Sequence, residues 1–248
     1  MTPTENFISH LIELRSRLLR IAIGLLVVFV ALFPFANDIY SLLAAPLLNK
    51  LPIGGQMIAT GVTTPFFVPI KVAMMTAFLV SLPHTLYQVW AFVAPGLYAH
   101  EKKFMIPMIV ASSLLFLFGM AFAYFLVFPV VFGFIVGTAP EGVAVMTDIG
   151  NYLDFVMTLF FAFGLAFEVP IAVVMAVRFG WVSIAALKDA RGYVVVGAFV
   201  IGAIFTPPDI ISQFMLAVPM WLLYELGIVV AAFTGKKPEP TILPPSDR

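Results

Sequence analysis

Residues 104–136 read FMIPMIVASSLLFLFGMAFAYFLVFPVVFGFIV, a run without a charged side chain. As one straight helix this run would be about 50 Å long, whereas the hydrocarbon core of a bilayer is about 30 Å thick. The run therefore predicts a membrane-spanning helix that tilts or curves. The whole composition agrees, because 62% of the 248 residues are hydrophobic and 10% are charged, against about 25% charged in soluble domains.

Five further apolar runs accompany this one, and most approach the roughly 20 residues that a spanning helix needs. They cover residues 21–40, 66–94, 152–177, 194–205 and 210–233. The fifth helix in chain order, 194–205, would reach about 18 Å and is expected to be short. We predict an all-α integral membrane protein with six transmembrane helices.

The chain is expected to form a single polytopic membrane domain over residues 1–248, in three parts. Residues 1–20 are predicted to be a cytoplasmic amphipathic segment, and residues 21–233 the six-span core. Residues 234–248 are rich in proline and charge, which predicts a disordered cytoplasmic tail. Between the first two spans lies IYSLLAAPLL, a stretch too short to span, which is expected to form a cap on the outer surface.

The distribution of lysine and arginine predicts the orientation, because cytoplasmic loops carry an excess of both. With the amino terminus inside, the outer side carries Lys50 and Lys71. The other eleven of the 13 basic residues fall on the inner side: Arg15, Arg17, Arg20, Lys102, Lys103, Arg178, Lys188, Arg191, Lys236, Lys237 and Arg248. Both termini are therefore expected in the cytoplasm.

Several function classes are disfavoured by the residues present. The formal net charge is zero, so no basic excess exists to neutralise nucleic-acid phosphates. The three histidines do not occur in a zinc-binding spacing, and no phosphate-binding glycine loop or nucleophile elbow occurs. We expect no enzyme, no metal site and no cofactor.

Polar residues in and beside the apolar runs are the candidate functional groups. Glu13 and Arg17 form an i,i+4 pair on one face of the amino-terminal helix, and such exposed pairs contribute a few tenths of a kcal/mol. Glu168 lies inside an apolar run, where an ionisable group is expensive and marks a functional hypothesis. Gln213 is a plausible hydrogen-bond partner for it. Asp209 is expected to cap the last helix.

Five prolines inside the predicted spans each remove a backbone hydrogen bond and are expected to bend their helices. They are Pro83, Pro107, Pro129, Pro170 and Pro219. Bent helices can form a concave surface instead of a tight bundle.

Five stretches carry a resemblance to a known family: HLIELRSRLL (10–19), YQVWAFVAPGLYAHEKKF (87–104), GMAFAYFLVFP (119–129), TPPDIISQ (206–213) and AVPMWLLYELG (217–227). The chain resembles TatC, the core subunit of the twin-arginine protein translocase, from about residue 10 to residue 233. The resemblance implies six bent helices in a cup-like arrangement, with short fifth and sixth helices.

The resemblance also implies a function. The family exports folded proteins across the bacterial cytoplasmic (inner) membrane, uses the proton-motive force, and recognises cargo by signal peptides with consecutive arginines. The implied partners are the single-span subunits TatA and TatB and further copies of the chain in a receptor complex.

The resemblance assigns roles to particular residues. Glu101 and Glu13 match the glutamates that contribute to recognition of the two arginines, and a carboxylate suits the planar arginine fork. Phe92 matches an aromatic near the signal-peptide site, and Arg15 and His10 belong to the same amino-terminal motif as Glu13.

Four other positions match as well. Glu168 and Gln213 match polar positions associated with docking of partner helices. Pro46 matches a proline of the outer cap, and Asp209 matches the acid of the PPD turn.

Two other functions are compatible with the composition. A proton-coupled small-molecule secondary transporter would use Glu168 as its proton site, but such transporters usually show repeated halves, and no repeat is visible. A scaffold for single-span proteins would tolerate neutralisation of Glu13 and Glu101. Composition does not separate the three, and the motif match favours the translocase.

Overall fold

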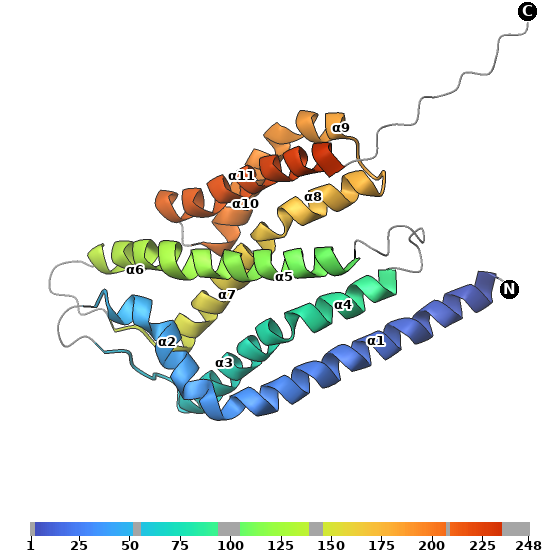
Figure 1. Cartoon of the computed structure of the whole chain (residues 1–248). Helices are drawn as coiled ribbons and strands as arrows, with labels where there is room; N and C mark the ends of the chain where they lie inside the picture. The colour runs from blue at the N-terminus through green and yellow to red at the C-terminus, as the bar shows by residue number, and fades with distance from the viewer. Residues whose placement is uncertain (1–2, 52–55, 94–104, 139–145, 207–208, 235–248) are drawn as a thin grey trace, which may run out of the picture.

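A computed structural model describes residues 3–51, 56–93, 105–138, 146–206 and 209–234 (Figure 1). In these ranges the chain forms helices and no strand, with one isolated parallel bridge between Ile58 and Asp148. The helices are α1 (Pro3–Leu32), α2 (Ala36–Leu48), α3 (Thr64–Val80), α4 (Leu82–Val93), α5 (Met105–Phe122), α6 (Phe128–Gly137), α7 (Ile149–Phe167), α8 (Val169–Arg178), α9 (Ile184–Asp189), α10 (Arg191–Phe205) and α11 (Ile210–Thr234).

Four helical stretches in the described ranges are long and apolar enough to cross a membrane, and the bent pair α3–α4 makes up to five. The four are Ile8–Leu48, Ile106–Gly137, Ile149–Arg178 and Ile210–Phe233. Helix α10 has 15 residues and is shorter than a typical span. An all-helical membrane protein is therefore confirmed, whereas six complete spans and their orientation stay predictions.

The sixth predicted helix, α11, contains the shortest of the four span-length stretches, with 24 residues against 41, 32 and 30. Helix α11 has 25 residues, and at 1.5 Å per residue it is about 37 Å long, enough to cross a hydrocarbon core of about 30 Å. The short fifth helix is confirmed as α10. At the other end of the chain, α1 runs continuously from Pro3 to Leu32, so the predicted amphipathic segment is the first part of one long helix.

Proline explains where the long helices break. Pro83 and Pro170 follow directly after the junctions α3–α4 and α7–α8, and the first of these bends the chain by 57°. Between α5 and α6 lies a π-helical turn, Ala123–Val127, which ends just before Pro129. Proline lacks the N–H that would continue the ladder, so the helix re-forms with proline in its first turn. By contrast, Pro219 lies inside α11, which continues through it.

Helix α7 is the centre of the core. Leu153, Val156, Leu159 and Phe163 are fully buried on it, and α5, α3 and α11 pack around it. Small residues allow the closest approach: a Cβ built at Gly119 of α5 would lie 2.5 Å from the carbonyl oxygen of Phe163. Close packing across small residues is a usual way for membrane helices to associate.

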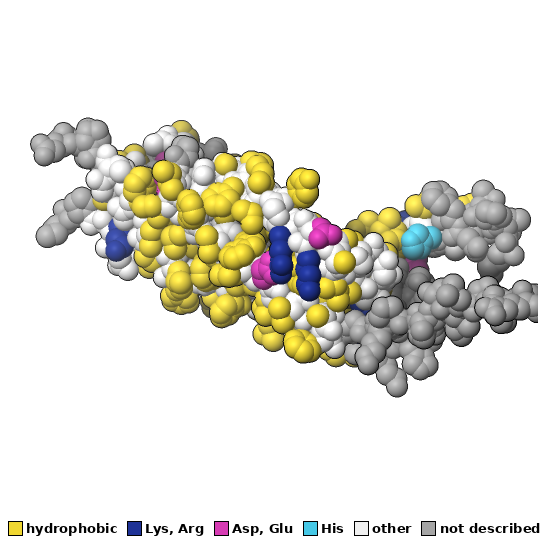
Figure 2. Space-filling view, turned by 90° about the horizontal axis from the view of Figure 1, so that it is seen from above, with side chains coloured by type: hydrophobic (Ala, Val, Ile, Leu, Met, Phe, Trp, Pro, Cys, Tyr) yellow, Lys and Arg dark blue, Asp and Glu magenta, His cyan; other side chains and the backbone are white. Residues whose placement is uncertain are grey.

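The helices are arranged so that two ends can be distinguished (Figure 1). The start of α1, the end of α4 and the start of α5 lie at one end, here called the amino-terminal end. Helix α2, the end of α6 and the start of α7 lie at the opposite end. Between them, the face over α9–α11 is largely hydrophobic, with a small group of basic and acidic side chains (Figure 2).

Candidate functional site

Helices α1 and α4 run antiparallel and join through a row of polar and aromatic contacts toward the amino-terminal end. The ring of His10 stacks on the ring of Phe92, with centroids 4.3 Å apart and planes inclined by 22°. Two turns further along α1, Arg17 donates from Nη1 to the side-chain oxygen of Gln88 at 3.1 Å. We call this row, formed by His10, Glu13, Arg17, His84, Gln88 and Phe92, the α1–α4 seam.

Helical spacing explains why these side chains meet. His84, Gln88 and Phe92 follow one another at intervals of four residues, so they lie on one face of α4. The ring nitrogen Nε2 of His84 lies 3.2 Å from the carbonyl oxygen of Arg20. Gly24, one turn later, leaves room for that ring, because a Cβ there would lie 3.0 Å from the imidazole.

Glu13 is held on this seam by Arg17, whose Nη2 lies 3.1 Å from Oε1 of Glu13. Arg17 gives one nitrogen to Glu13 and the other to Gln88, so the arginine does not grip the carboxylate with both. The Glu13 side chain is 32% exposed, whereas Gln88 is 5% exposed. The buried amide therefore positions the guanidinium, and the carboxylate stays accessible to a second cation.

The other predicted signal-peptide residues are placed differently. Arg15 is exposed on α1. Glu101 lies outside the described residues, in the segment between α4 and α5. Only the sequence relates Glu101 to the seam, since it follows Phe92 by nine residues.

Glu168 lies at the junction of α7 and α8 and accepts a hydrogen bond from the hydroxyl of Ser112 on α5. Its Oε1 is buried without a hydrogen-bond partner in the described part of the chain. Gln213, the plausible partner, does not make this bond among the described residues: it lies in the first turn of α11, where its backbone N–H donates to the carbonyl oxygen of Asp209, and Glu168 is bonded by Ser112 instead. Within the described residues, no group of three or more His, Cys, Asp or Glu is placed to hold a metal ion.

Asp209 caps α11 as predicted. Its Oδ1 accepts from the backbone N–H of Ser212 at 2.7 Å, the third residue of the helix, which is the usual geometry of an aspartate cap. Pro46 is buried in α2. This helix is tied to α7 by the hydroxyl of Tyr152, which donates to the carbonyl of Leu43 at 2.6 Å.

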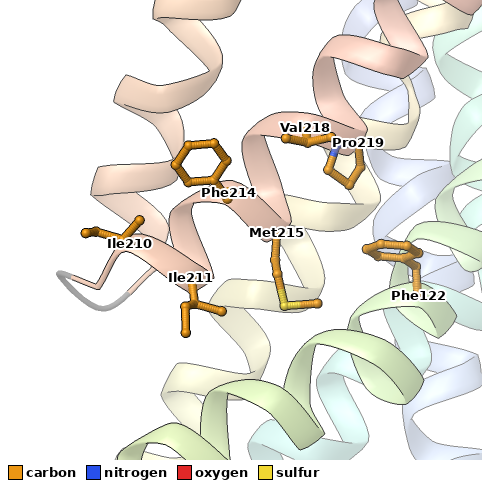
Figure 3. Close-up of a pocket in the computed structure, with 7 residues that line it drawn as sticks. All are labelled: Phe122, Ile210, Ile211, Phe214, Met215, Val218 and Pro219. Carbon is orange, nitrogen blue, oxygen red and sulfur yellow. The ribbon is translucent and has the colours of Figure 1, made fainter.

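A hollow of about 420 Å³ lies beside the amino-terminal half of α11 (Figure 3). All of its lining side chains are apolar: Phe122, Ile210, Ile211, Phe214, Met215, Val218 and Pro219. Phe122 comes from α5 and the others from α11, the helix that also carries Gln213. The surface is suited to contact with an apolar helix or lipid.

Sequence reasoning missed several polar contacts. Gln88 and Ser112 lie within apolar runs as uncharged side chains, and such residues carry little signal by themselves. The sequence assigned Lys71 to the outer side but indicated no partner for it, whereas its Nζ lies 2.6 Å from Oδ1 of Asp154. Asp154 itself escaped attention, although a second acid inside an otherwise apolar run is a signal that could have been used.

The comparisons with known proteins give one answer. The family model described as "Sec-independent protein translocase protein (TatC)" matches residues 9–219. A protein of that name from Azotobacter chroococcum mcd 1 is 55% identical over 233 residues, covering 94% of this chain and 91% of the relative. One from Escherichia coli (strain K12) is 55% identical over 230 residues, covering 93% and 89%.

Solved structures agree with the sequence relatives. A crystal structure of the twin-arginine translocase receptor TatC superposes with a TM-score of 0.77 at 38% identity, covering 90% of this chain and 98% of the other. A second crystal structure of that receptor, in DDM, gives a TM-score of 0.79 with 92% and 100% covered. The chain therefore belongs to the TatC family of Sec-independent protein translocase proteins.

Proposed function

We propose that this chain is the signal-peptide receptor and core subunit of a twin-arginine translocase, and that the α1–α4 seam is part of its recognition site. The observation that carries the proposal is the accessible carboxylate of Glu13, which is paired with Arg17. Arg17 is itself bonded to the buried Gln88. Glu13 follows His10, the residue that stacks on Phe92, by three positions on α1. A carboxylate beside an aromatic platform is suited to a guanidinium, which binds both.

Glu101 supplies the second carboxylate in this proposal. The segment that carries it follows directly after α4, so it begins at the end of the helix that presents Phe92. Each carboxylate then takes one arginine of the signal. Lysine is a weaker substitute, because its ammonium is a compact point charge without the bidentate fork. Arg15 and His10 complete the site as neighbours on α1.

The proposed location is the bacterial cytoplasmic membrane, with both termini in the cytoplasm. The start of α1, the end of α4 and the start of α5 lie at the same end of the molecule (Figure 1). Eleven of the 13 basic residues are assigned to that side by the sequence, which supports the orientation. A site at this end would meet cargo before export.

Partner subunits are proposed to dock on the face of α7, α8 and α11. The single-span subunits TatA and TatB are apolar helices in the membrane, and the hollow beside α11 offers them an apolar surface (Figure 3). Glu168 and Gln213 are the polar groups proposed to meet polar residues of such helices, since interhelical hydrogen bonds add to association in lipid. Pro46 and Asp209 shape the opposite end, and export would draw on the proton-motive force.

Site-specific photocrosslinking tests the receptor proposal. A benzophenone amino acid at Phe92 replaces one aromatic side chain by a larger one, and the matched control carries it at Val200, an exposed residue of α10. An Arg-Arg signal peptide is expected to crosslink at position 92 and not at position 200, and a Lys-Lys peptide less at position 92. Equal crosslinking at both positions would refute the site.

A further inference from the structure

Near the end opposite the seam, an ion pair and a hollow lie together on α3, α7 and α10. Lys71 and Asp154 approach to 2.6 Å, with their side chains 43% and 56% exposed. Asp154 also lines a hollow of about 430 Å³, together with Phe155 and Thr158 of α7 and with Ile204, Phe205 and Thr206 at the end of α10.

The depth of this pair within the helices is unusual for an exposed ion pair. Asp154 is five residues after the start of α7, or about 7.5 Å along the helix, and Lys71 is about 10 Å into α3. Exposed charges in hydrocarbon are costly, and an exposed pair gains little from its own attraction. The pair therefore needs water or polar headgroups in contact with it.

The short helix explains how headgroups reach this level. Helix α10, with 15 residues, is about 22 Å long, so it falls about 8 Å short of a hydrocarbon core of about 30 Å. Its far end, the residues Ile204 to Thr206, lines the hollow beside Asp154. The shortfall of α10 thus matches the depth of Asp154 along α7, and a bilayer that adapts to the length of α10 would bring its headgroups to the level of Asp154.

We propose that the hollow binds the headgroup of phosphatidylethanolamine, with its ammonium at Asp154 and its phosphate at Lys71. The lining residues offer acceptors to an ammonium: the carboxylate of Asp154, and the hydroxyl oxygen of Thr158, whose own proton is donated to the carbonyl oxygen of Asp154. The carboxyl end of α10, which carries partial negative charge, lies at the same hollow. The rings of Phe155 and Phe205 suit a cation as well.

This chemistry distinguishes between lipid classes. A primary ammonium donates three hydrogen bonds and satisfies several acceptors at once. The quaternary ammonium of phosphatidylcholine has no N–H to donate. Phosphatidylglycerol has no cation and brings net negative charge toward Asp154. The site is thus specific for the ethanolamine headgroup, and it does not depend on the receptor function proposed above.

Native mass spectrometry of the full chain in detergent tests the proposal by titration with phosphatidylethanolamine, phosphatidylglycerol and phosphatidylcholine. The expected result is at least a fivefold preference for phosphatidylethanolamine, reduced to less than twofold by Asp154→Asn. Glu225→Gln breaks the comparable ion pair with Arg191 (2.6 Å) and serves as the control that keeps the preference.

A charge exchange separates a headgroup site from a structural ion pair. The double variant Lys71→Asp with Asp154→Lys keeps an ion pair but places an ammonium at the hollow. The proposal predicts that this variant loses its preference for phosphatidylethanolamine. If the exchanged variant keeps the preference, or if the wild type shows none, the pair is structural only and the proposal is wrong.

Discussion

The imidazole of His10 stacks on the phenyl ring of Phe92 at a centroid distance of 4.3 Å, joining the first turns of α1 to the last turn of α4. The contact spans 82 positions of sequence and lies at the point where the chain leaves α4 toward Glu101. It fixes both the aromatic surface and the point from which the Glu101 segment starts. The stack is therefore a positioning element of the proposed recognition site.

Loss of the stack should weaken signal-peptide binding. An aromatic pair is worth about 0.5–1.5 kcal/mol, so His10→Ala is expected to reduce affinity for an Arg-Arg peptide about 2- to 10-fold. His10→Phe retains a stacking ring and should bind nearly as well as the wild type. Fluorescence anisotropy with a labelled peptide measures both. An equal loss in the two variants would assign the effect to the imidazole nitrogens instead of the stack.

Replacing Gln88 should destabilise the α1–α4 seam. In Gln88→Leu the guanidinium of Arg17 loses its buried acceptor, and a hydrogen bond to a charged group is worth about 1.5–3 kcal/mol. The variant is expected to unfold at a lower temperature in a thermal stability assay in detergent. Gln88→Glu keeps an oxygen acceptor and is the matched control. A Leu variant as stable as the wild type would show that the Arg17 contact does not hold the helices together.

The hydrogen bonds of Asp148, which join the segment around Thr60 to the start of α7, should be lost in acid; we call this group of bonds the Asp148 clasp. Asp148 accepts from the hydroxyl and N–H of Thr60 at 2.7 and 2.8 Å, and from the N–H groups of Asn151 and Gly150. These bonds, the Thr60 hydroxyl first, lower the pKa of Asp148 from 3.8 to about 2. A lowered pKa means that the clasp is complete above about pH 4 and is lost as the pH falls through about 2.

Pepsin, which works in acid, reports this change. Cleavage near residues 56–63 is expected to be slow at about pH 4 and to accelerate toward pH 2, when the carboxylate takes a proton. In Asp148→Ala the same segment should be cleaved readily at both pH values. If wild type and variant show the same pH profile, the aspartate does not anchor the loop.

The packing of α5 on α7 should not tolerate a methyl group at Gly119. A Cβ there would lie 2.5 Å from a backbone carbonyl, which cannot rotate away, and overpacking costs about 1–3 kcal/mol. Gly119→Ala is therefore expected to lower thermal stability. Gly133 has no atom within 4 Å of its built Cβ, so Gly133→Ala is the control and should be neutral or stabilising. Equal stability of the two variants would contradict the close packing of α5 on α7 at Gly119.

Much of the fold was predictable from composition and proline alone. Long apolar runs predicted the helices, and Pro83, Pro129 and Pro170 predicted where they break or distort, because a missing N–H acts locally. The length of α11 also agrees with its apolar run, since the run 210–233 corresponds to a helix of 25 residues. The π-helical form of the turn Ala123–Val127 was not predictable, because it interrupts an apolar run that carries no charge or proline at that point.

The candidate site was predictable in part. Glu13, His10 and Phe92 came from motifs, and the structure brings the latter two into contact. The pairing of Gln88 with Arg17 and of Lys71 with Asp154 depends on which helices become neighbours, at separations of 71 and 83 positions. Helical periodicity assigns a residue to one side of its helix, but it does not predict which other helix packs against that side.

The most direct test of the receptor account is a cycle of four binding measurements. Wild type and Glu13→Gln are each titrated with an Arg-Arg and a Lys-Lys signal peptide. Asp154→Asn serves as a control that removes a distant carboxylate. The same cycle with Glu101→Gln tests the second carboxylate. Direct recognition of arginine by Glu13 predicts that each change weakens binding by about 1–3 kcal/mol and that the losses are not additive. Equal binding in all four combinations, or losses that simply add, would contradict direct recognition of arginine by Glu13.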